Sequence, residues 1–133
     1  MIDTQFAPFL RRVLMFDAAT CVLTGIVLLA LAAALEQMLA IPAAVSRVAA
    51  VVLLVFAAGV GYVSTRDPLL RPAVTVIVAM NVLWAVASVL ALVFAWLMPN
   101  RLGQAFVIAQ ALAVAIIAGL QIAGLRRGVR VAI

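Results

Sequence analysis

Residues 9–35, FLRRVLMFDAATCVLTGIVLLALAAAL, decide the fold class, because a pair of arginines leads into an apolar run with one acidic residue, Asp17, inside it. The eighteen residues that follow Asp17 carry no charge. A helix needs about 20 mostly apolar residues to cross the roughly 30 Å hydrocarbon core of a bilayer. The run therefore predicts a membrane-spanning helix over residues 13–35. Its carboxylate needs a partner, because a lone charge in lipid is costly.

The composition of the whole chain indicates the same class. The 133 residues amount to one domain, and 70% of them are hydrophobic, against roughly 45–50% in soluble domains. A soluble protein of this size has too little interior to hide so many apolar side chains. Three further apolar segments, 43–65, 72–97 and 104–125, are long enough to span a membrane, and none alternates as a strand would. We expect residues 1–133 to form a single all-α membrane domain, a bundle of four transmembrane helices.

The arginines predict how the bundle is oriented. The formal net charge is +5, and all nine basic residues are arginines placed singly or in pairs between apolar blocks, a pattern that does not favour nucleic acid. Two arginines, Arg47 and Arg101, fall on one side of the membrane. The other seven fall on the opposite side: Arg11, Arg12, Arg66, Arg71, Arg126, Arg127 and Arg130. Cytoplasmic loops carry the excess of basic residues. We therefore expect a multi-pass protein of the bacterial inner membrane, with both termini in the cytoplasm and anionic lipid headgroups as partners there.

Three polar residues are expected at one depth in the membrane. Asp17, Asn81 and Gln121 each lie eighteen or nineteen residues from the outer end of their segment, which places them about 27–29 Å below the outer surface. Asp17 has Asn81, Gln121, or an arginine such as Arg71 or Arg126 as its expected partner. Three interpretations stay open: hydrogen bonds that join helices, a proton or cation site of a transporter, or a contact with another protein.

A second polar set lies farther along the same helices. Thr24 follows Asp17 by seven residues and Ser88 follows Asn81 by seven, so each pair shares a helix face. Trp84 lies in the middle of its segment, away from the interface where tryptophan is common. Its indole N–H needs an acceptor, and Ser88 or Gln110 can supply one. Trp84 is either core packing or the aromatic wall of a ligand site.

Small residues at helical spacing mark where helices can approach closely. One such step is formed by Ala57 and Gly61. A longer run is formed by Ala111, Ala115, Gly119 and Ala123. The pattern predicts tight packing and leaves open whether the partner helix belongs to this chain or to another subunit.

The residue types that are missing limit the chemistry. The chain has no histidine and a single cysteine, Cys21, so histidine-ligated haem, the usual zinc and copper sites, and Ser-His-Asp or Cys-His catalysis are excluded. It also lacks a phosphate-binding glycine loop and paired carboxylates at catalytic spacing. We expect no enzyme activity, no metal and no cofactor.

Two functions fit these features. The first is an accessory or scaffold subunit of a larger membrane assembly, or a homo-oligomer. The alternative is a small proton- or cation-coupled transporter or channel that uses Asp17. The layout of four helices with one embedded acid in the first resembles the small multidrug resistance family, in which that acid is a glutamate. The resemblance implies that Asp17 exchanges protons for lipophilic cations.

Overall fold

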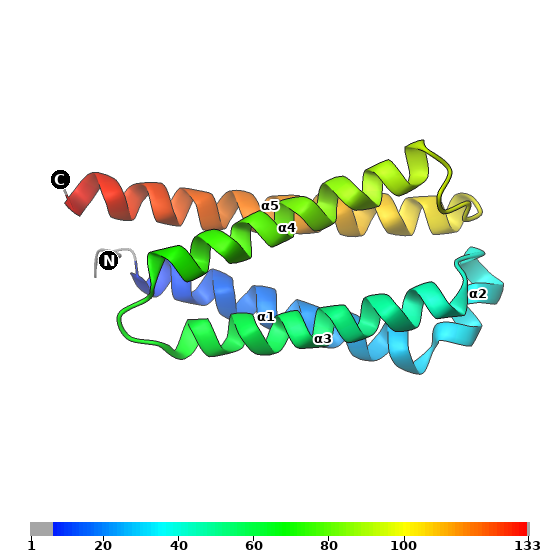
Figure 1. Cartoon of the computed structure of the whole chain (residues 1–133), viewed down its shortest axis with the longest axis horizontal. Helices are drawn as coiled ribbons and strands as arrows, with labels where there is room; N and C mark the ends of the chain where they lie inside the picture. Colours follow the sequence, from blue (N-terminus) through cyan, green and yellow to red (C-terminus); the bar gives the residue numbers. More distant parts are fainter. Residues whose placement is uncertain (1–6, 133) are drawn as a thin grey trace.

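The computed structural model describes the backbone of residues 7–132 and the side chains of residues 8–127. Its helices are α1 (Ala7–Ala30), α2 (Ala32–Leu39), α3 (Ala43–Thr65), α4 (Arg71–Val93) and α5 (Arg101–Ala132), as Figure 1 shows. Four of them, all except α2, are long and apolar enough to cross a membrane. The predicted all-α fold is confirmed, with four helices that are long and apolar enough to span a membrane. The side chain of Arg130, one of the expected topology signals, lies outside the described residues.

The helices of the structure differ from the predicted first segment, about 13–35, at both ends. The helix begins at Ala7, so the arginine pair lies inside it. The Arg11 guanidinium donates hydrogen bonds to the carbonyl oxygens of Ser64 and, at 3.0 Å, of Arg66, which satisfies carbonyls at the end of α3. Arg11 is therefore a capping group of a neighbouring helix. At the other end, the helical conformation is interrupted at Leu31, and the short helix α2 follows.

The predicted third helix, 72–97, ends four residues early. Helix α4 stops at Val93, and Ala95 has a φ of 55° in the left-handed region. The aromatic rings of Phe94 and Trp96 stack with their centroids 5.4 Å apart, so the turn is covered by two large side chains. The predicted segment included residues 94–97 because they are hydrophobic, although they lie beyond the end of the helix.

The predicted fourth helix, 104–125, is too short because its cap went unrecognised. Helix α5 begins at Arg101, and the side-chain oxygen of Asn100 accepts a hydrogen bond from Gly103 N–H at 2.9 Å. The Asn100 amide group donates to the Met38 carbonyl at 2.8 Å, and its backbone N–H donates to the Leu39 carbonyl at 3.1 Å. Asn100 thus caps α5, and its hydrogen bonds link the start of α5 to the end of α2. The second segment, 43–65, coincides with α3.

The four long helices form two antiparallel pairs, α1 with α3 and α4 with α5 (Figure 1). The pairs touch mainly through α1 and α5, whereas α3 and α4 scarcely meet. At the end of the bundle that holds both termini, a core cluster draws side chains from all four long helices. It consists of Leu10, Leu14, Val60, Leu69, Val74, Ile77, Val78 and Leu125. At the α2 end, a smaller cluster of Leu39, Ile41 and Val107 joins the pairs again.

Two glycines mark close approaches between elements. A Cβ at Gly25 would meet the Leu54 side chain and the Ala50 carbonyl oxygen, so α1 and α3 pack tightly there. A Cβ at Gly103 would collide with the Leu39 carbonyl oxygen and with Pro99 Cβ. Both close contacts are possible because glycine has no side chain.

The small residues singled out in the sequence lie in different surroundings. Ala57 and Ala111 are buried, and Gly61 and Ala123 are partly buried. Ala115 and Gly119 are exposed on the surface of α5, and a Cβ at Gly119 would meet no atom within 4 Å. Among the described residues, the first member of the longer run, Ala111, is thus the one that is fully buried.

These positions give a matched pair of substitutions. We expect Gly103→Ala to lower the free energy of unfolding by about 1–3 kcal/mol, because the backbone of Leu39 has to move. Gly119→Ala, the control, places the same methyl group in open space and should leave the stability unchanged or slightly raised. Denaturant titration in detergent micelles, followed by circular dichroism, measures both. Equal effects of the two substitutions would contradict the close contact between α5 and α2.

Candidate functional site

A polar cluster joins three helices in the interior of the bundle. Asp17 of α1 accepts two hydrogen bonds on Oδ2, one from Asn81 Nδ2 of α4 at 2.9 Å and one from Gln121 Nε2 of α5 at 2.8 Å. Asn81 Nδ2 also donates to Gln121 Oε1 at 3.0 Å. The three side chains form a closed ring of hydrogen bonds, which we call the Asp17 cluster.

The Asp17 cluster is sealed from its surroundings. The side chains of Asp17, Asn81 and Gln121 are 2%, 4% and 0% exposed. Among the described residues, no side-chain nitrogen or oxygen atom that is itself wholly inaccessible lacks a hydrogen bond. In a hydrocarbon environment an unsatisfied polar group costs several kcal/mol. The cluster meets that requirement from within the chain.

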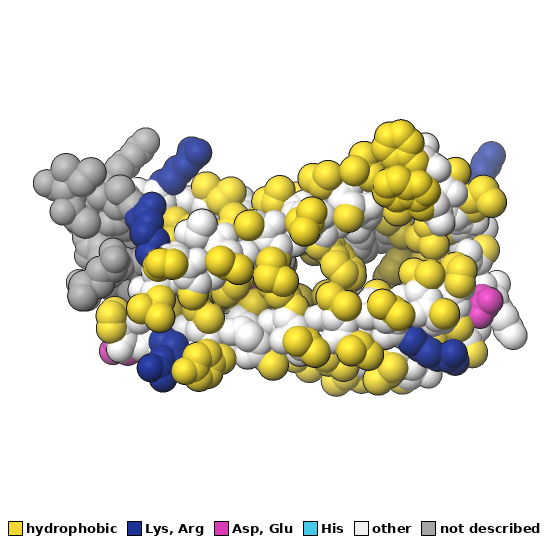
Figure 2. All heavy atoms as spheres, in the orientation of Figure 1, with side chains coloured by type: hydrophobic (Ala, Val, Ile, Leu, Met, Phe, Trp, Pro, Cys, Tyr) yellow, Lys and Arg dark blue, Asp and Glu magenta, His cyan; other side chains and the backbone are white. Residues whose placement is uncertain are grey.

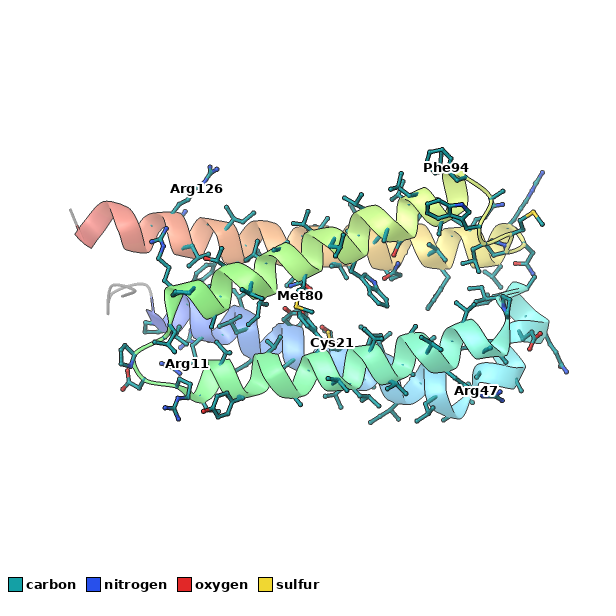
Figure 3. All side chains as sticks on the ribbon, in the orientation of Figure 1. Arg11, Cys21, Arg47, Met80, Phe94 and Arg126 are labelled. Carbon is teal, nitrogen blue, oxygen red and sulfur yellow. The ribbon has the colours of Figure 1, made fainter. Side chains whose placement is uncertain are left out.

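Cys21 completes the surroundings of the carboxylate. Its Sγ donates to Asp17 Oδ1 at 3.6 Å, and Figure 3 labels it at the middle of the molecule, between the two helix pairs. The sequence analysis identified Cys21 only as the single cysteine of the chain. Because Cys21 follows Asp17 by four residues, the i,i+4 spacing on a helix was the available signal.

The arginines lie away from the cluster. Arg11 is committed to the end of α3. Arg126 lies at the terminal end of α5 and points away from the bundle (Figure 3). All the hydrogen bonds found on the Asp17 carboxylate come from uncharged groups, the two amides and the thiol. Of the partners left open by the sequence, the structure brings the amides to Asp17.

Helix α3 contributes no polar group at this level. A count of eighteen or nineteen residues from Pro42, where the second segment begins, ends at Val60 and Gly61, and Val60 belongs to the apolar core cluster with 1% of its surface exposed. The Asp17 cluster therefore connects one helix of the first pair to both helices of the second. It is a hydrogen-bonded bridge between the pairs.

The second polar set forms a network within the α4–α5 pair. Trp84 Nε1 donates to Gln110 Oε1 at 2.8 Å, and Gln110 Nε2 donates to Ser88 Oγ at 3.0 Å. The Ser88 hydroxyl donates in turn to the Trp84 carbonyl at 2.8 Å. Thr24, which the sequence grouped with these residues, comes from α1 and forms no hydrogen bond with these described side chains. The hydrogen bonds of this network join α4 to α5, and Trp84 also packs against the buried apolar cluster of α1 and α3, which consists of Cys21, Leu28, Ala50, Leu53 and Ala57.

A cavity of about 260 Å³ separates the two helix pairs beside this network. Its wall is almost wholly apolar. The lining residues are Thr24, Leu28, Leu35, Leu39, Ile41, Val45, Ser46, Ala49, Leu53, Trp84, Ala87, Ser88, Ala91, Leu97, Phe106, Val107 and Gln110. Figure 2 shows the surface hollowed between the pairs, in the half of the molecule farther from the termini. Ser46, which the sequence analysis did not single out, is a polar member of this wall and is 3% exposed.

The site holds no arrangement suited to a metal. Among the described residues, no three histidine, cysteine, aspartate or glutamate side chains are placed to bind one ion. Comparison with protein-family models, with curated proteins and with solved structures gave no match to this chain.

The Asp17 cluster can be tested by removing its central amide. We expect Asn81→Leu to lower the free energy of unfolding by about 1–3 kcal/mol, because it takes donors from both Asp17 and Gln121. A double-mutant cycle with Gln121→Leu should show a coupling energy of at least about 0.5 kcal/mol.

Gln104→Leu is the control for this experiment. Gln104 is exposed near the start of α5, and its Nε2 makes only a 3.4 Å contact with the Pro99 carbonyl. Its loss should change the stability little. Additive effects of Asn81→Leu and Gln121→Leu would mean that the two amides do not share the carboxylate.

Proposed function

We propose that this protein is an accessory or scaffold subunit of the bacterial inner membrane, working within a larger membrane assembly or as a homo-oligomer. The observation that carries the proposal is the Asp17 cluster, whose hydrogen bonds are satisfied inside the chain. A group closed off in this way fixes the two helix pairs relative to each other. Such a group is better suited to a structural role than to binding a substrate.

The distribution of apolar surface supports this role. Helix α4 exposes large side chains along its length, among them Val76, Leu83, Val86 and Val93. The segments between the helices are short: residues 40–42, 66–70 and 94–100. Most of the described chain is thus membrane-spanning helix with surface available to lipid or to neighbouring subunits.

The arginines support an orientation with both termini in the cytoplasm. Arg11 and Arg126 lie at the end of the bundle that holds the termini, and Arg47 lies toward the other end (Figure 3). An excess of arginine at one end is the pattern of a cytoplasmic face. Arg126 and Arg127 border a hollow on the surface of α5, a position suited to anionic lipid headgroups.

Native mass spectrometry of the protein, extracted gently from its own membranes at natural abundance, tests the role. We expect a complex of fixed stoichiometry that contains other membrane subunits or several copies of this chain. The control is the same extraction after dilution into excess detergent, which separates fixed contacts from co-solubilised neighbours. A protein that emerges only as a single chain would contradict the proposal.

Transport is a second candidate, favoured by one observation. Among the described residues, the hydrogen bonds on the Asp17 carboxylate come from uncharged groups, and an embedded acid with this environment is typical of proton or cation pathways. In this role Asp17 changes its charge as a cation or proton binds.

Asp17→Asn distinguishes the two roles. For a framework, we expect the substitution to lower the stability by about 1–3 kcal/mol and to weaken assembly, with binding of tetraphenylphosphonium absent in both forms. For a transporter, the wild-type protein binds tetraphenylphosphonium in competition with protons, and the variant loses that competition. Binding that stays flat between about pH 5 and pH 9 would contradict the transport role.

A further inference from the structure

The hydroxyl groups of the described helices fall into two classes. Serine and threonine in helices commonly bond to a carbonyl three or four residues earlier. Five of them do so here: Thr20, Ser64, Thr65, Thr75 and Ser88. The remaining two, Thr24 and Ser46, have no such bond among the described residues, and both line the cavity between the helix pairs.

A hydroxyl in an apolar cavity is unfavourable unless something bonds to it. Ser46 is 3% exposed, and Thr24 is partly buried. Trp84, Ser88 and Gln110 line the same cavity, but their polar atoms are bonded to one another. Thr24 and Ser46 are therefore the hydroxyls left available to a molecule in the cavity.

The wall of the cavity sets the charge and size of that molecule. None of the lining residues is charged, so an ion would enter without a counter-charge, and a neutral molecule is favoured. The cavity of about 260 Å³ exceeds the roughly 150 Å³ that suffices for benzene in an apolar protein interior. A substituted six-membered ring fits, with the indole of Trp84 as an aromatic wall.

The spacing of the two hydroxyls sets where the polar groups of the ring lie. Gly25 packs on Leu54 and the Ala50 carbonyl, so the neighbouring Thr24 lies near the level of Leu53. Ser46 precedes Leu53 by seven residues, which separates the two hydroxyls by about 10 Å along the helix axis. A six-membered ring with an oxygen at each end, and a hydrogen bond of about 2.8 Å at each oxygen, spans that separation.

We propose that the cavity binds an uncharged six-membered ring with oxygen atoms at para positions, the hydroquinone and quinone class, between Thr24 and Ser46. A hydroxyl group both donates and accepts, so either form of the ring can be held. The proposal goes beyond the framework role and does not depend on it.

Tryptophan fluorescence provides the test. The chain has two tryptophans. Trp96 lies outside the cavity wall and is 71% exposed, so Trp96→Phe leaves Trp84 as the one reporter. Bromohydroquinone, kept reduced with ascorbate, is the probe, because bromine quenches tryptophan on contact. The matched control probe is 2-bromo-para-xylene, which has methyl groups in place of both hydroxyls.

We expect saturable quenching of Trp84 by bromohydroquinone, with an affinity at least about tenfold higher than that for 2-bromo-para-xylene. Thr24→Val and Ser46→Ala should each weaken bromohydroquinone binding roughly fivefold and leave 2-bromo-para-xylene unchanged. Thr75→Val is the control substitution, since its hydroxyl is exposed and bonded to the Arg71 carbonyl. Circular dichroism shows that each variant is folded before its binding is measured. If only one of Thr24→Val and Ser46→Ala folds, that variant alone tests the proposal.

Four results would overturn the proposal. Quenching that rises linearly for both probes would mean partition into the micelle only. Equal affinities for the two probes would mean that the hydroxyls take no part. Quenching of Trp84 by a phosphatidylcholine with brominated acyl chains, not displaced by bromohydroquinone, would make the cavity a lipid groove. If neither probe reaches Trp84, another protein chain fills the space, and the proposal fails as well.

Discussion

The hydrogen bonds on the Asp17 carboxylate are the interaction on which the arrangement of the bundle depends. Packing of apolar side chains does not hold helices together in lipid as it does in water, because lipid tails are as apolar as the side chains. A carboxylate in that environment has to find its donors within the protein. Asn81 and Gln121 supply them from the opposite helix pair. One acid on α1 therefore determines which faces of α4 and α5 turn inward.

The second polar network acts differently although it uses similar residues. Trp84, Ser88 and Gln110 form hydrogen bonds within the α4–α5 pair, so their hydrogen bonds do not cross to α1 and α3. At this level the pairs meet through the packing of Trp84 against apolar side chains of α1 and α3. The cavity lies where the polar residues of α4 and α5 form hydrogen bonds with each other. The Asp17 cluster lies where they form hydrogen bonds with a residue of the other helix pair.

The sequence predicted the number of spanning helices and the common depth of three polar residues, because both follow from a fixed rise per residue along apolar runs. It did not predict the helix ends. Arg11 was taken for a signal flanking the membrane, but its long side chain reaches the carbonyls at the end of α3. Asn100 lies outside the predicted segments 72–97 and 104–125, although it caps α5. Ser46 was overlooked because its surroundings come from residues distant in sequence, which no local pattern reveals.

The cavity stays open because contacts on both sides of it hold the two helix pairs in place. Toward the termini, the Asp17 cluster and the core around Leu14 hold the pairs together. Toward α2, Asn100 bonds to Met38 and Leu39, and Gly103 permits the close contact. Closing the space between these attachments would require α3 to approach α4, and Trp84 on the α4 side is held by its bond to Gln110. The apolar cavity is fixed at both ends and supported by an aromatic ring. It is therefore preorganised for a ligand, because few side chains have to become ordered when one binds.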